Sequence, residues 1–265
     1  MCIINNPVES VRNTKLFVGL NINKTKQIVV YSNKISNSYN NNAMILPCAH
    51  PNSIQFHRMD KYKTFFDDLS SNFVKHGNNR KYSYGETVLC CSLNTIPVVD
   101  IGSYLVSIVP TIDDFNRIDS NYFTINNNVL EIFKNEYPPD FGYIVCKLKI
   151  GVQVDYEPLA YSHILYEKNK VFIPTLHYHP YIDNIIKEEI TADWSHDIYI
   201  MNCLASENNK KLYNEMKDLY NNYDYQKVTN VKYENINFNF DYEKYMTKLC
   251  INGTKTNKDL IFDVD

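Results

Sequence analysis

The chain of 265 residues is 44% hydrophobic, 14% aromatic and 22% charged. This composition excludes a disordered chain, and the length is at the upper end of what one domain holds. With 27 basic against 30 acidic residues the net charge is -3, so no basic excess neutralises phosphates and nucleic acid is not an expected partner.

The compartment is expected to be the cytoplasm. No apolar run reaches the roughly 18 residues of a membrane span, and the start of the chain lacks the features of a signal peptide. The seven cysteines are scattered without framework spacing, which is typical of reduced thiols. We therefore expect an intracellular protein with no membrane partner. Asparagine occupies roughly one position in eight, which indicates an AT-rich genome rather than a chemical role.

The first third of the chain predicts strands and one helix. Residues 14–20 and 27–32 are β-branched and apolar runs separated by a short polar turn, a pattern that predicts a β-hairpin. Residues 43–47 form a short apolar run closed by proline, as in a buried strand. Between Tyr62 and Phe73, aromatic and aliphatic residues recur at helical spacing, so we expect an amphipathic helix with one apolar face on the core.

The middle of the chain continues this mixture. Residues 98–109 are apolar around Gly102 and predict one strand, and residues 111–114 look like the start of a short helix with a carboxylate in its first turn. A second helix around residues 129–133 should end at Pro138, because proline has no amide hydrogen and restricts the residue before it.

The second half is predicted to be rich in strands. Candidate strands lie at residues 141–149, 156–163, 170–177 and 197–203. A late amphipathic helix is expected between Leu212 and Tyr223, and the chain ends on an apolar run at 260–262. Strands and helices do not alternate regularly, so the fold class is α+β, with largely antiparallel sheets and a few packed amphipathic helices in one domain.

Cys2 is the first candidate for chemistry. Removal of Met1 would leave a thiol and a free α-amine on one residue, and that amine titrates near pH 8. The amine could then act as the base for its own nucleophile, as in N-terminal nucleophile hydrolases. The alternative is that Cys2 only begins a frayed terminus.

Histidines and an aspartate form the second candidate. His177 and His179 end a predicted strand, where a period of two puts both imidazoles on one face. Asp193 and His196 come just ahead of the following strand and could complete a metal site for an ion such as zinc. Alternatively, one histidine pairs with Cys2 as a general base oriented by Asp193. Ordinary hydrogen-bonded histidines are the remaining interpretation.

These motifs also carry a resemblance. The chain resembles an uncharacterised family found in bacteria, amoebae and related sources. The matching stretches are the Met-Cys start, Asn13 to Phe17, the strand at 27–32, the Ala-Met-Ile-Leu-Pro run at 43–47, Tyr62 to Leu69, residues 109–115, Phe141 to Lys149, Phe172 to His179 and Ala192 to Tyr199.

The resemblance covers residues 1–203 and leaves 204–265 as a helical or irregular C-terminal extension packed on the domain. It implies no assigned reaction. The pattern contains the Met-Cys start, the His-x-His and the Asp-x-x-His motifs, and this chain departs from it at Pro180, where the family has Asp-Gly.

Three hypotheses therefore remain open. The first is a thiol hydrolase acting on an amide or acyl bond of a small-molecule or peptide substrate, with Cys2 as the nucleophile and His177, His179, Asp193 and His196 nearby. The second is a metal-binding protein that uses the three histidines and Asp193. The third is a non-catalytic binding or structural protein with no cofactor.

Overall fold

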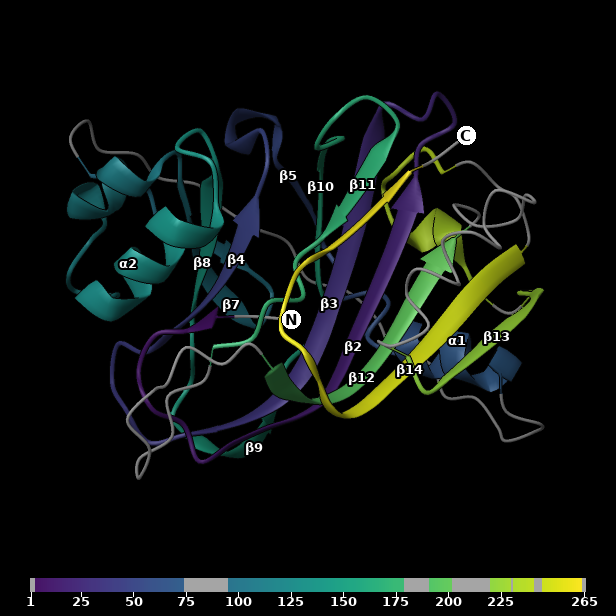
Figure 1. Ribbon diagram of the computed structural model, residues 1–265, viewed down its shortest axis with the longest axis horizontal. Helices are drawn as coiled ribbons and strands as arrows, with labels where there is room; N and C mark the ends of the chain where they lie inside the picture. Colours follow the sequence, from purple (N-terminus) through teal and green to yellow (C-terminus); the bar gives the residue numbers. More distant parts are fainter. Residues whose placement is uncertain are drawn as a thin grey trace.

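The computed structural model describes residues 3–73, 95–178, 191–201, 220–229, 231–240 and 245–263. Their largest sheet has the strand order β13, β14, β12, β2, β3, β10, β5, and β9 pairs with β3 (Figure 1). The strands of this sheet are β2 (Ser10–Leu20), β3 (Lys26–Asn37), β5 (Gln55–His57), β9 (Gly151–Asp155), β10 (Leu159–Ile164), β12 (Thr191–Met201), β13 (Asn222–Lys227) and β14 (Tyr245–Thr256).

A second sheet of five strands has the order β1, β4, β8, β7, β6, and a third consists of β11 and β15. Their strands are β1 (Ile3–Ile4), β4 (Ala43–Cys48), β6 (Val99–Ile101), β7 (Tyr104–Val109), β8 (Gly142–Lys147), β11 (Lys170–Ile173) and β15 (Leu260–Asp263). Among the strand pairs of the described residues, only β12 with β2 is parallel.

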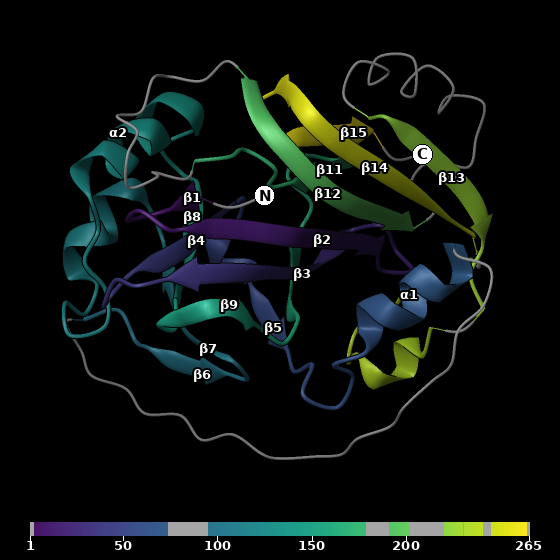
Figure 2. The ribbon, with the colours of Figure 1, turned by 90° about the horizontal axis from the view of Figure 1, so that it is seen from below.

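The described helices are few. They are α1 (Phe65–Phe73), α2 (Asn127–Glu136) and the 3-10 turns η1 (Pro51–Ser53), η2 (Ile112–Arg117) and η3 (Tyr233–Asn235). Figure 2 shows α1 and α2 on opposite sides of the molecule, with the sheets between them. The prediction of an α+β fold with largely antiparallel sheets is confirmed in this coarse form, but sheets rather than packed helices make up most of the architecture.

The hairpin at the start of the chain forms the centre of the large sheet. β2 and β3 pair antiparallel from Leu20 with Gln27 onward, as predicted. Leu16 and Val18 contribute to the largest core cluster, whereas Phe17 packs into the cluster that contains the buried residues of α1. Because both faces of these strands are covered, their sequence is an almost continuous apolar run.

Two of the predicted helices, at 62–73 and around 129–133, form as α1 and α2, and the short helix predicted to start at 111–114 is the 3-10 turn η2. Phe65, Phe66 and Leu69 are the buried residues of α1. Helix α2 begins after Asn126, whose side chain accepts a hydrogen bond from the amide of Asn128, and it ends two residues before Pro138. The predicted strand at 43–47 is β4, and all of its residues are buried.

Other predictions differ from the structure. The single strand expected at 98–109 is a hairpin of β6 and β7, because Gly102 adopts a positive φ of 63° and the chain turns there. The strand expected at 170–177 ends at Ile173. Asp193 and His196 lie inside β12 rather than ahead of it.

The C-terminal part contains three strands where a helical or irregular extension was expected. β14 pairs with β12 along its whole length, and β13 pairs with β14. Tyr223, expected at the end of a helix, lies in β13, and residues 202–219 lie outside the described residues. Within the described ranges, no helix has both the length and the apolar character required to cross a membrane.

Candidate functional site

The rings of two predicted site residues, His177 and His196, and the ring of Trp194 are in mutual contact. Trp194 and His196 are alternate residues of β12 and share its core-facing side, and His177 follows the end of β11. The ring centroid of His177 lies 4.5 Å from that of Trp194 and 4.7 Å from that of His196. The exposed fractions of His177, Trp194 and His196 are 8%, 2% and 4%. The fold therefore brings together two of the predicted histidines from segments that are far apart in the sequence.

The hydrogen bonding of His196 restricts its chemistry. The backbone amide of Ser195 donates to Nδ1 of His196 at 2.9 Å. A ring nitrogen that accepts a hydrogen bond carries no proton, so the neutral imidazole has its proton on Nε2. In this arrangement Nε2 cannot accept a proton from a nucleophile or bind a metal ion.

His177 is positioned through its backbone. The side chain of Asn257, in the connection between β14 and β15, accepts from the amide of His177 at 2.7 Å and donates to its carbonyl at 2.8 Å. One amide side chain thus replaces a pair of ladder hydrogen bonds at a residue that lies outside any strand.

Asp259 holds the two residues before His177. Its Oδ1 accepts hydrogen bonds from the amides of Thr175 at 2.6 Å and Leu176 at 2.7 Å, and its Oδ2 accepts from the hydroxyl of Tyr137 at 2.7 Å. Desolvation raises the pKa of the Asp259 carboxyl, and the three donors act in the opposite direction. Desolvation and the nearby Asp259 charge raise the pKa of Tyr137 well above its ordinary value, so this hydroxyl remains a donor.

The start of the chain lies against the same segment. Ile3 forms a parallel bridge with Tyr178, and the amide of Ile4 donates to the carbonyl of Tyr178 at 2.8 Å. Ile3 and Tyr178 are buried in one core cluster. The residue that follows Cys2 is therefore paired with the residue between His177 and His179, across 175 positions of sequence.

The remaining predicted site residues are described only in part. Cys2 and His179 lie outside the described residues. Asp193 is placed by its backbone alone, which pairs with Thr254 of β14. In a regular strand, positions 193 and 196 belong to opposite faces, since they are separated by an odd number of residues. This alternation argues against Asp193 and His196 facing one common site.

The described ranges contain no group of three or more histidine, cysteine, aspartate or glutamate residues arranged to hold a metal ion. Two of the four expected ligands, His179 and Asp193, are not covered by that statement, so the metal site remains a prediction.

A buried histidine and serine form a second contact of interest. Nε2 of His57 in β5 lies 2.8 Å from Oγ of Ser162 in β10. Desolvation lowers the pKa of His57, and the residues are only 3% and 2% exposed. This pair has the composition of a catalytic dyad, but its burial leaves no access for a substrate.

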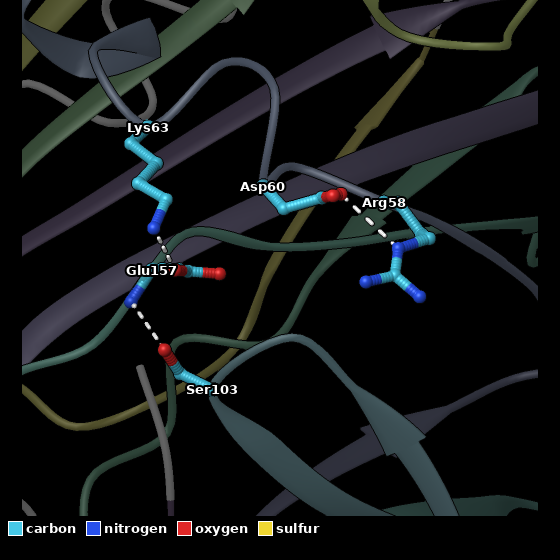
Figure 3. Close-up of polar contacts among 5 residues, drawn as sticks. All are labelled: Arg58, Asp60, Lys63, Ser103 and Glu157. Atoms are coloured by element: carbon cyan, nitrogen blue, oxygen red, sulfur yellow. Dashed lines mark hydrogen bonds and ion pairs between the residues drawn. The ribbon is translucent and has the colours of Figure 1, made fainter. Parts of the chain in front are cut away.

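A charged cluster joins the two large sheets at the surface (Figure 3). Lys63, just before α1, forms an ion pair with Glu157, and the backbone amide of Glu157 donates to Oγ of Ser103 in the turn between β6 and β7. Arg58 binds Asp60 at 3.1 Å through Nε. The carboxylate of each pair is less exposed than its basic partner, so the basic groups cover the acidic ones and the cluster is suited to holding loops together.

No family model matches the chain. Among solved structures, baculovirus P35 matches with a TM-score of 0.53 and 15% sequence identity, over 99% of this chain and 99% of P35. The fold resembles that of P35. The structure of the caspase-8/P35 complex also matches, with a TM-score of 0.48 and 12% identity over 96% of each chain.

The similarity to P35 extends over both large sheets, because nearly the whole of each chain is covered. It includes the C-terminal strands, which the sequence analysis expected to be a helical or irregular extension of the same domain.

Sequence reasoning also missed the residues that position the site. Asn257 and Asp259 lie in a short polar stretch between two strands and look like ordinary turn residues. Their partners are about 80 positions earlier in the chain, from His177 at 80 to Thr175 at 84. The one sequence signal near these residues was the apolar run at 260–262 that follows Asp259.

Proposed function

We propose that this chain is a binding protein on a P35-type scaffold, and that its partner is a caspase-class protease. The observation that carries the proposal is the end-to-end similarity of fold to P35, at a TM-score of 0.53 over 99% of both chains. P35 itself has been solved in complex with caspase-8. Because one fold can serve several functions, the partner must be tested directly.

The candidate site supports binding over catalysis. His177, Trp194 and His196 are nearly inaccessible, and Nδ1 of His196 is occupied by a backbone amide. The His57 and Ser162 pair is equally buried. The side chains of His196, His57 and Ser162 are thus engaged in contacts inside the fold.

The test uses the full chain and active caspase-8. We expect the two proteins to co-elute in size-exclusion chromatography, and the chain to reduce cleavage of a fluorogenic peptide by caspase-8. Intact-mass analysis of the mixture shows whether the chain is cut. Trypsin and papain serve as comparison proteases. A chain that neither co-elutes with caspase-8 nor changes its activity at micromolar concentration would refute the proposal.

A second candidate, a thiol hydrolase with Cys2 as nucleophile, is favoured by one observation. The pairing of Ile3 with Tyr178 sets the chain start beside the His177 segment. In this proposal the thiol of Cys2, freed by loss of Met1, adds to the carbonyl carbon of an amide or acyl substrate, and its proton passes by way of His177 or His179 to the amine or alcohol that leaves. Water then hydrolyses the thioester and releases the acid.

Intact mass decides whether Met1 is removed, and labelling by an acyl-ester probe reports the nucleophile. We expect Cys2→Ala to abolish labelling. Cys250→Ala is the matched control, because Cys250 is a partly exposed free thiol whose pKa is raised, mainly by desolvation. Retention of Met1, or labelling that survives Cys2→Ala, would exclude the hydrolase without affecting the caspase proposal.

A further inference from the structure

The connection between β14 and β15 makes an unusual set of contacts. Three consecutive backbone amides, of Thr175, Leu176 and His177, are all satisfied by side chains of this connection rather than by a strand. The hydroxyl of Thr175 donates in addition to the carbonyl of Lys258 at 2.9 Å. All three amides of a segment outside the strands are thereby satisfied.

The same segment holds the chain start on its other side. The carbonyl of Tyr178 accepts from the amide of Ile4, and Ile3 packs with Tyr178 in a shared core cluster. Residues 257–259, residues 175–178 and strand β1 are thus linked in series. Loss of the contacts from residues 257–259 removes support from residues 175–178, and these in turn support one side of β1.

We infer that Asn257 and Asp259 form a latch that positions the His177 segment and, through it, the start of the chain. Asp259 is the main element, because one carboxylate accepts two neighbouring amides and the Tyr137 hydroxyl, and hydrogen bonds to a charged acceptor are stronger than those between neutral groups. When the latch opens, the 175–178 segment is released and the Ile4 amide loses its acceptor, whereas β1 stays paired with β4. This inference does not depend on the proposed function.

The fluorescence of Trp194 can report opening of the latch. Trp194 is the only tryptophan of the chain, and its ring contacts that of His177 at 4.5 Å. When the His177 segment leaves, the indole gains contact with water, and its emission maximum shifts to the red.

Hydrogen exchange tests the latch in the full chain. Asp259→Ala should accelerate exchange of the amides at 175 and 176 by about tenfold or more, because each loses a hydrogen bond to a charged acceptor. Amide exchange at Ile4 should rise with them, and Trp194 emission should shift to the red. Exchange in the centre of β2 and β3 should stay at the wild-type rate.

Two further variants separate positioning from general destabilisation. Asp259→Asn keeps an oxygen acceptor and should recover most of the protection at 175 and 176. Lys258→Ala is the matched control, because its exposed side chain is removed while its carbonyl stays. If Asp259→Ala does not fold, Asn257→Ala tests the same latch through His177 alone. Unchanged exchange at 175–177, or equal acceleration in β2 and β3, would overturn the inference.

Discussion

His163 makes the stability of this protein depend on pH in a predictable way. It is 1% exposed in β10, and desolvation lowers its pKa from 6.5 to about 4. Its Nδ1 lies 2.7 Å from the carbonyl of Ile164 and donates to it, and its ring stacks on Tyr161 with centroids 5.9 Å apart. Nε2 is therefore the nitrogen that must gain a proton.

The sign follows from proton binding in the two states. Between pH 6.5 and about 4 the unfolded chain holds a proton on His163 and the folded chain does not. Stability is thus complete above pH 6.5 and is lost as pH falls to about 4. Lowering the pKa from 6.5 to about 4 corresponds to about 3 kcal/mol, at roughly 1.4 kcal/mol for each tenfold change in proton affinity.

Urea denaturation at several pH values between 4 and 7.5 tests this with His163→Gln. The variant cannot titrate at this position, so the difference in free energy of unfolding between wild type and variant should shrink by about 3 kcal/mol from pH 7 to pH 4. Asp259, whose pKa is raised, and His57, whose pKa is lowered, titrate in both proteins and cancel in the difference.

His50→Asn is the matched control, since His50 is exposed and asparagine tolerates its left-handed backbone. The charge of His50 contributes a minor part of the lowered pKa of His163. The His50→Asn variant should therefore keep most of the stability that wild type loses between pH 7 and pH 4. A difference between wild type and His163→Gln that stays constant with pH would refute the reasoning.

Three substitutions, and Val152→Ala as a control, test the packing and the helix cap. Gly142→Ala would place a Cβ 2.3 Å from Cβ of Pro51, so we expect it to destabilise the fold by about 1–3 kcal/mol or more, measured as a loss in thermal midpoint. Asn126→Ala removes the cap of α2 and should cost about 1 kcal/mol in urea denaturation, and a cost near zero would contradict the capping bond. Ile144→Ala in the core should cost about 2–5 kcal/mol, whereas Val152→Ala, at a residue that is 86% exposed, should stay within about 0.5 kcal/mol. Equal costs for these two would contradict the packing.

The local part of the fold follows from sequence pattern. The hairpin of β2 and β3, the buried strand β4 and the helix α1 each depend on residues within one segment, and apolar spacing predicts all three. The turn at Gly102 was missed, because apolar residues occur close to it on both sides, at Ile101 and Tyr104. A single glycine inside a strand-like run gives little indication of whether the chain turns there.

The C-terminal strands could not be assigned in the same way. β14 lies next to β12 in the sheet, but its sequence from Tyr245 to Thr256 contains lysines, threonines and Asn252, which reads as polar tail. Its buried positions include Leu249 and Ile251, at alternate residues, and this is the period of a strand with one covered face. Without knowledge of β12 as its neighbour, that short alternation does not separate a strand from irregular chain.

The candidate site could be predicted from the sequence only in part. Residue type identified His177 and His196, because imidazoles are suited to several kinds of chemistry, and the fold brings their rings to 4.7 Å. Residue type could not show that a neighbouring backbone amide occupies Nδ1 of His196, since that bond depends on the rotamer within β12. Nor could it identify Asp259 and Asn257, whose roles exist only because β14 and β15 return the chain to residues 175–177. What this site can do therefore depends on the groups that hold His177 and His196 as well as on the two imidazoles.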